Sequence, residues 1–301
     1  MIATNLHISV TLTSEFRLEQ ALKQAGIEDP ASVTRLTISG TLTDDDFRYI
    51  RENMSKTLHE LDMSGASTDG NIIKARALKN CTGLTAVFIP SSTTQMNSLA
   101  FWGCTGLTFI AAHPGNGKAL NRVNPVFSSE DGVLFNKEKT RLISYLRGRQ
   151  GGYIIPTSVV RIDDYAFAGC NDLTSVMTHP DNPVFASENG VLFNKGKTKL
   201  ILYPRGRKGD YSIPGSVVEI GHSAFFRCTG LSSVFIPDSV VKIGECAFAF
   251  SNKLISIDIP KSVIEIGEQA FEDCPANIIV NPDNSVYASE SGKLRKRMKD
   301  D

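Results

Sequence analysis

The 301-residue sequence lacks the features that would point to several common classes of function. Lysine plus arginine and aspartate plus glutamate both number 32, so the net charge at pH 7 is close to zero. Such a balance provides no long-range field to attract nucleic acid or an anionic membrane. No apolar run approaches the roughly 18 residues of a membrane span, and no CxxC spacing suggests zinc. We therefore expect no nucleic-acid partner, no membrane span, no metal and no cofactor.

Repetition is the dominant feature of the sequence. Between Tyr211 and Cys274 one phrase occurs three times, as YSIPGSVVEIGHSAFFRC, VFIPDSVVKIGECAFAFS and IDIPKSVIEIGEQAFEDC. Ile220, Ile243 and Ile266 stand at the same place in the three copies. A fixed period of about 20 to 30 residues is typical of a solenoid, in which each repeat forms one turn and covers the apolar side of the next. These three isoleucines are therefore predicted to form a column.

The apolar residues within one repeat predict its path. Leu231, Val234 and Ile236 are spaced as in a strand that faces a core, and an Ile-Pro step ends the strand because proline cannot donate to a ladder. A second apolar group around Val240 and Ile243 predicts a short outer stretch. Each repeat is thus expected to form a strand, a turn, a second extended stretch and a return.

The phrase IPxSVxxIGxxAFxxCxxL, which runs from Ile213 to Leu231, resembles the BspA-like leucine-rich repeat family. The resemblance implies a leucine-rich repeat solenoid, a right-handed, β-rich superhelix with a concave parallel sheet. It also implies a secreted or cell-surface bacterial protein of adhesin or binding type, without catalytic residues. MIATNLHISV has neither a basic start nor a sustained apolar core. If the family's surface location holds, we expect an export signal to have been removed before Met1.

Three segments follow from the repeat pattern. Residues 1–57 lack the repeat and predict an α/β N-terminal cap, with one helix capped by Ser14 and another capped by Thr43. Residues 58–281 form the leucine-rich repeat solenoid, in which nine repeats are predicted. Residues 282–301 are predicted to be a degenerate repeat and C-terminal tail with a frayed edge.

Two of the nine repeats are enlarged, at about 107–149 and 173–207, and they carry matching text. The first contains NPVFSSEDGVLFNKEKT from Asn124, and the second contains NPVFASENGVLFNKGKT from Asn182. In each, two apolar stretches flank a polar turn, which predicts a hairpin. The hairpin is expected to replace the short outer stretch of its repeat.

Five of the six cysteines occupy one repeated position after an Ala-Phe or Ala-Leu step, and Ser251 takes that position in another repeat. A small buried side chain explains this pattern better than disulfide bridging does. Free thiols are therefore predicted. The five residues are Cys81, Cys104, Cys170, Cys228 and Cys274.

Acidic residues recur at polar positions of the outer stretch, where a solvated face is the default interpretation. A glycoside hydrolase would need two of these carboxylates to converge, and nothing in their spacing indicates this. A solenoid-based glycoside hydrolase is therefore only a remote alternative, and the sequence predicts no enzyme and no catalytic residue. The residues are Asp163, Asp164, Glu219, Glu245, Glu265 and Glu268.

Alternation along the long strands predicts which side chains point away from the core. Two outward positions per strand bear apolar residues in the middle of the sheet. Exposed apolar stripes often mark contact surfaces, whereas single exposed apolar residues are normal. The candidate binding residues are Phe88, Phe109, Ile154, Met177 and Phe235.

Two functions remain open at this point. The favoured hypothesis is a binding or adhesin-like surface protein that docks a protein or glycan on the concave face. The alternative is a structural or self-associating protein of the cell envelope. Neither the partner, the oligomeric state nor the role of the hairpins follows from the sequence.

Overall fold

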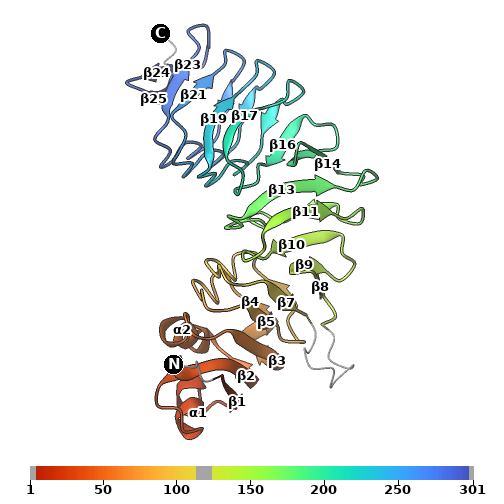
Figure 1. The fold of residues 1–301 in the computed structure, drawn as a ribbon, viewed down its shortest axis with the longest axis vertical. Coiled ribbons are helices and arrows are strands. Elements are labelled where there is room, and N and C mark those ends of the chain that lie inside the picture. The colour runs from red at the N-terminus through yellow and green to blue at the C-terminus, as the bar shows by residue number, and fades with distance from the viewer. Residues whose placement is uncertain (1–4, 113–123, 298–301) are drawn as a thin grey trace. The chain divides into compact units, whose positions relative to one another are not determined.

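The computed structural model describes residues 5–112 and 124–297. The chain divides into two compact units, each described by itself. Unit one comprises Met1–Arg149 and Arg161–Cys170, and unit two comprises Gln150–Val160 and Asn171–Asp301. Each unit is built mainly of short strands (Figure 1). Each also has its own buried apolar cluster.

A parallel sheet with the strand order β1-β2-β3-β5-β7 forms the main sheet of unit one. Helices α1 and α2 connect its first three strands. The bounds are β1 (Leu6–Leu12), α1 (Leu18–Gln24), β2 (Val33–Leu42), α2 (Asp44–Asn53), β3 (Glu60–Thr68), β4 (Ile72–Ile73), β5 (Ala86–Phe88), β6 (Gln95–Met96), β7 (Phe109–Ala111), β8 (Phe127–Glu130), β9 (Val133–Asn136), β10 (Arg141–Tyr145) and β12 (Arg161–Ile162). Short 3-10 turns lie at Pro30–Ser32 and Asp69–Asn71.

The sequence predicted the start of one N-terminal helix correctly and that of the other wrongly. The helix expected after Thr43 is α2, and the Thr43 N–H donates to the Asp46 carboxylate at 2.8 Å. The predicted cap at Ser14 is wrong, because α1 begins at Leu18. The Leu18 N–H donates instead to Oδ1 of Asp46, 3.0 Å away. A single buried carboxylate from α2 thus satisfies donors at the start of both helices.

Unit two contains two ladders of parallel strands. The long strands β17, β19, β21 and β23 pair in that order (Figure 1). The outer strands β16, β18, β20 and β22 also pair in sequence order. The bounds are β11 (Gly151–Ile155), β13 (Leu173–Thr178), β14 (Phe185–Glu188), β15 (Val191–Asn194), β16 (Lys199–Leu202), β17 (Gly209–Ser212), β18 (Glu219–Ile220), β19 (Leu231–Phe235), β20 (Lys242–Ile243), β21 (Ser256–Ile259), β22 (Glu265–Ile266), β23 (Asn277–Val280), β24 (Tyr287–Glu290) and β25 (Lys293–Lys296).

The column predicted from the 23-residue period is present. Ile220 pairs with Ile243, and Ile243 pairs with Ile266, in parallel register. Beside this column the phenylalanine rings stack: Phe248 lies 4.8 Å from Phe225 and 5.7 Å from Phe271, centroid to centroid, with nearly parallel planes. One residue per turn therefore occupies each column, and the rings fill the same layer of the core.

Each enlarged repeat holds two turns rather than one. As expected, β15 and β16 form an antiparallel hairpin, and β16 takes the place of the outer stretch by pairing with β18. However, the Val176 N–H donates to the carbonyl of Gly190 at 2.8 Å. The β14–β15 turn thus lies beside β13, where the long strand of a further turn belongs. Tyr203 then stacks 5.1 Å from Phe225 and extends the aromatic column.

The first enlarged repeat repeats this arrangement in unit one. Strands β8, β9 and β10 are antiparallel, β10 pairs in parallel with β12, and Tyr145 lies 5.4 Å from Phe167. Residues 113–123 of this repeat lie outside the described residues. With two turns in each enlarged repeat, the nine predicted repeats become a solenoid of about eleven turns.

The degenerate copy of the hairpin is more regular than predicted as far as the structure describes it. Within the segment expected to fray, β24 and β25 form an antiparallel hairpin that extends to Lys296. The Tyr287 ring is buried, and its hydroxyl oxygen accepts a hydrogen bond from the Ile266 N–H at 2.9 Å. The third, degenerate copy of the hairpin therefore still packs against the last turn.

The cysteine column consists of free thiols, as predicted. The Cys104 thiol donates to the carbonyl of Leu78 in the preceding turn at 2.9 Å, and Ser251 donates in the same way to Phe225 at 2.7 Å. Burial raises the pKa of Cys81 and of Cys228 to about 12. These thiols therefore stay protonated at neutral pH and act as small core side chains.

Candidate binding surface

The predicted outward positions of the long strands are in register within each unit. In unit one Ala86 pairs with Phe109, and Phe88 pairs with Ala111. In unit two Ile154 pairs with Met177. The adjacent inward residues Val176 and Val234 are buried. We use the name sheet face for the outward side chains of β11, β13, β17, β19, β21 and β23 of unit two.

Three of the predicted binding residues are exposed on the sheet face. The exposed fraction is 55% for Ile154, 43% for Met177 and 62% for Phe235. Phe109 of unit one is also exposed, at 43%. The structure therefore places four of the five candidate side chains in solvent, three of them on unit two.

The expectation that Phe88 points into solvent is wrong. Its side chain is only 8% exposed, and the Phe109 ring lies 5.5 Å from it, centroid to centroid. Phe109 occupies an outward position on the next strand, and the residue directly opposite Phe88 is the small, fully buried Ala111. The large ring thus packs against Phe88 and covers it on the outward side of the sheet, so Phe88 is not open to solvent.

The sheet face is not a continuous apolar stripe. Phe235 pairs with Ser212 on one side, and Asp258 stands at the equivalent place on β21 on the other. Ile279 of β23, which pairs with Asp258, is 46% exposed and was not predicted. The alternation in Asn277–Val280 could have identified it, because Ile278 and Val280 are both buried. Apolar and polar residues therefore alternate from turn to turn.

Negative charge accompanies the exposed Phe235 ring. Asp210 pairs with Ser233, two residues before Phe235 on the same face. Hydrogen bonds from Ser233 and Ser232 lower the pKa of Asp210, so its carboxylate is ionised at neutral pH. Asp258 adds a second carboxylate at the level of the ring. This part of the sheet face offers an aromatic ring between two acids.

Three of the six carboxylates predicted for the outer stretch form ion pairs between turns. Glu219 lies 2.8 Å from the Lys199 ammonium, and Glu265 lies 2.6 Å from that of Lys242. Asp163 accepts two hydrogen bonds from Arg141. Each of these three carboxylates therefore faces a cation of a neighbouring turn. In the part of the chain that the structure describes, no group of three or more His, Cys, Asp or Glu residues could hold a metal.

Residues 32–116, 152–196 and 209–292 match the family model of the BspA type leucine rich repeat region, in six copies. The chain belongs to the BspA-type leucine-rich repeat family. As a BspA-type protein it shares a solenoid scaffold that is generally non-enzymatic. No helix of the described residues is both long enough and apolar enough to cross a membrane. None of the curated proteins matches the chain.

Several solved structures are similar to this BspA-type chain. A leucine-rich repeat protein from Eubacterium ventriosum is 19% identical with a TM-score of 0.50, over 80% of this chain and 66% of that one. The pneumococcal vaccine antigen PcpA is 18% identical with a TM-score of 0.46, over 85% of this chain and 65% of that one. A leucine rich cell surface protein from Faecalibacterium prausnitzii is 23% identical with a TM-score of 0.44, over 86% of this chain and 76% of that one. The chain spans slightly less than two thirds of the length of the first two.

Proposed function

We propose that this BspA-type protein is a non-enzymatic binding module that docks a protein or glycan partner on the sheet face of unit two. The observation that carries the proposal is the exposure of Ile154 and Met177 on the β11–β13 sheet and of Phe235 on the β17–β19–β21–β23 sheet, beside buried inward residues such as Val176 and Val234. Large apolar side chains held on a rigid surface are enriched at the centres of interfaces. Family membership supports a location on a bacterial cell surface or in the secreted fraction.

The chemistry of the sheet face favours a particular kind of partner. An apolar side chain, or the apolar face of a sugar ring, could cover Phe235. Basic groups around it would then meet the carboxylates of Asp210 and Asp258. Unit one adds Phe109 as a separate exposed aromatic residue. The ion-paired carboxylates of the outer stretch give no support to a hydrolase.

The test compares the wild-type chain with the triple variant Ile154→Ser, Met177→Ser and Phe235→Ser. Both are screened against arrays of extracellular proteins and of glycans, and each ligand found is titrated by calorimetry. We expect the triple variant to lose at least about tenfold in affinity, because hot-spot residues commonly contribute more than 1.4 kcal/mol each. A ligand that binds both chains equally well would contradict the proposal, as would a wild-type chain that binds nothing.

A matched control removes exposed apolar side chains from another surface of the same unit. Val218, Val241 and Ile264 are 41%, 36% and 60% exposed on the outer stretch. Their triple replacement by serine is expected to leave the affinity unchanged. Light scattering distinguishes the alternative function: a wild-type oligomer that the sheet-face variant loses and the control variant keeps would make this a self-association surface.

A further inference from the structure

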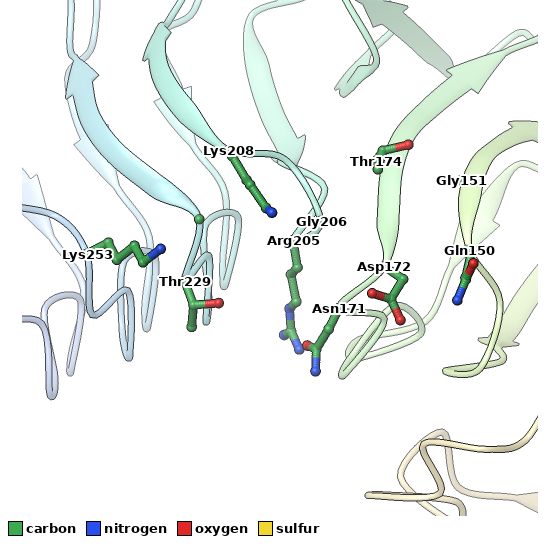
Figure 2. Close-up of a pocket in the computed structure, with 11 residues that line it drawn as sticks. Gln150, Gly151, Asn171, Asp172, Thr174, Arg205, Gly206, Lys208, Thr229 and Lys253 are labelled. Atoms are coloured by element: carbon green, nitrogen blue, oxygen red, sulfur yellow. The ribbon is translucent and has the colours of Figure 1, made fainter.

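A second candidate site in unit two is a polar hollow at the point where the chain enters the long strands (Figure 2). Its volume is about 470 Å³, within the range of about 300 to 1,000 Å³ that is common for small-molecule sites. None of the lining residues has an apolar side chain, so the hollow does not suit an apolar ligand. They are Gln150, Gly151, Asn171, Asp172, Thr174, Arg205, Gly206, Lys208, Thr229, Gly230 and Lys253.

Two of the lining glycines mark places where neighbouring turns approach closely. The Gly206 N–H donates to the carbonyl of Leu173 at 2.9 Å, and a Cβ at Gly206 would lie 2.8 Å from the same oxygen. A Cβ at Gly230 would lie 2.3 Å from the carbonyl oxygen of Arg207. Neighbouring turns therefore approach too closely at Gly206 and Gly230 to admit a side chain, so the wall of the hollow is backbone at these two positions. The Thr229 side chain lies between Lys208 and Lys253 (Figure 2).

Positive charge predominates in the hollow. Lys208 directly precedes Gly209, the first residue of β17, and Lys253 directly precedes the buried Leu254. Because Gly209 pairs with Leu231, Gly230 holds the position of Lys208 in the turn between them. Both lysines are exposed, and neither forms an ion pair with another described residue. The Arg205 guanidinium, which lies 5.1 Å over the Phe226 ring, adds a third cation. Asp172 is the one acid among the lining residues.

Neutral hydrogen-bonding groups surround these charges. Gln150, Asn171, Thr174 and Thr229 are exposed, and Figure 2 shows their side chains around the rim of the hollow. Amides and hydroxyls of this kind can both donate to and accept from sugar hydroxyls. A lone inorganic anion would need only the cations, whereas the size of the hollow and its neutral rim suit a larger, hydroxyl-rich ligand.

We propose that this hollow binds an acidic oligosaccharide, with its carboxylates or sulfates at Lys208 and Lys253 and its hydroxyls at the amide and threonine side chains. The site lies at the starts of the long strands and uses none of the exposed apolar residues of the sheet face. It therefore goes beyond the proposed function and holds independently of it.

The experiment titrates the full chain with tetragalacturonic acid by calorimetry at low ionic strength. We expect binding that weakens as NaCl is added, because exposed charges are screened. The double variant Lys208→Gln and Lys253→Gln is expected to bind about tenfold more weakly. Asp172→Asn is expected to bind more tightly, because it removes the one opposing charge.

Control ligands and control variants distinguish binding through charge from binding through the sugar alone, and both from a general effect of substitution. The fully methyl-esterified tetrasaccharide should bind at least about tenfold more weakly, and Lys261→Gln, an exposed lysine outside the hollow, should behave as wild type. The sheet-face triple variant should bind the acid normally. The proposal is overturned if tetragalacturonic acid gives no binding at millimolar concentration, or if the methyl ester or inorganic sulfate binds as tightly as the acid does. It is also overturned if the double variant Lys208→Gln and Lys253→Gln binds the acid as tightly as the wild type.

Discussion

Replacing Asn182 with alanine is expected to lower the free energy of unfolding by about 3 to 5 kcal/mol. The side chain is fully buried, and its amide nitrogen donates to the carbonyls of Pro156 at 2.8 Å and Val159 at 2.9 Å. Its Oδ1 accepts from the N–H groups of Val184 and Phe185. Alanine would leave these backbone groups of two adjacent turns without their partner in a place that water does not reach.

Urea unfolding followed by circular dichroism measures this effect. Asn182→Asp should also be destabilising, because a carboxylate keeps the two accepted bonds but faces two carbonyl oxygens without a hydrogen to donate. Asn171→Ala, at an exposed asparagine of the same unit, should change the free energy by less than about 0.5 kcal/mol. A loss below about 1 kcal/mol for Asn182→Ala would show that this clamp between turns contributes little.

Phe248→Ala should cost about 3 to 5 kcal/mol of stability. Its ring is fully buried between Phe225 and Phe271, and the turns that supply those rings cannot close the space without leaving their ladder. The cost therefore includes both the lost transfer free energy and a cavity. Urea unfolding of the purified wild type and variant measures this difference in the free energy of unfolding.

Phe235→Ala is the matched control, since it removes the same ring from the sheet face, where it is 62% exposed. A change of less than about 0.5 kcal/mol is expected there. Comparable losses for the two variants would mean that Phe235 is packed in solution and would remove the basis for assigning it to a binding surface. The pair of variants thus separates residues that hold the turns together from residues free to meet a partner.

The sequence period was sufficient to predict the stacking of equivalent residues. In a parallel ladder each turn contributes one residue to each column, so a spacing of 23 places Ile220 beside Ile243 and Ile243 beside Ile266. The same alternation predicted that Ile154, Met177 and Phe235 face outward. Both results depend only on local geometry, which a single sequence contains.

The enlarged repeats could not be resolved in this way, because antiparallel strands interrupt the 23-residue period. The sequence motif NPVF was recognised at Asn124 and Asn182, but the structural role of its asparagine depends on backbone groups of the preceding turn. Asn124 donates to the carbonyls of Pro90 and Thr93, as Asn284 does to Pro260 and Val263. The sequence therefore shows the repeated asparagine but not the carbonyl groups of the other turn to which it donates.

The prediction of the candidate site was wrong at one residue, Phe88, for a related reason. Alternation gives the direction of Phe88 but not the size of its neighbours, and the ring of Phe109 beside the small Ala111 decides that Phe88 is buried. The start of α1 at Leu18 likewise depends on Asp46, a residue 28 positions away. Both contacts belong to tertiary packing, which no local pattern specifies.

The most direct measurement of the stacked register is the spin–spin interaction between nitroxide labels on the exposed outer stretch. Val218 and Val241 occupy adjacent turns, and Ile264 lies one turn further on. Neighbouring strands are about 4.8 Å apart, so labels at 218 and 241 should broaden each other's spectra strongly, and labels at 218 and 264 less so. Equal or absent broadening in the two pairs would contradict the one-residue-per-turn column from which both proposed binding surfaces are derived.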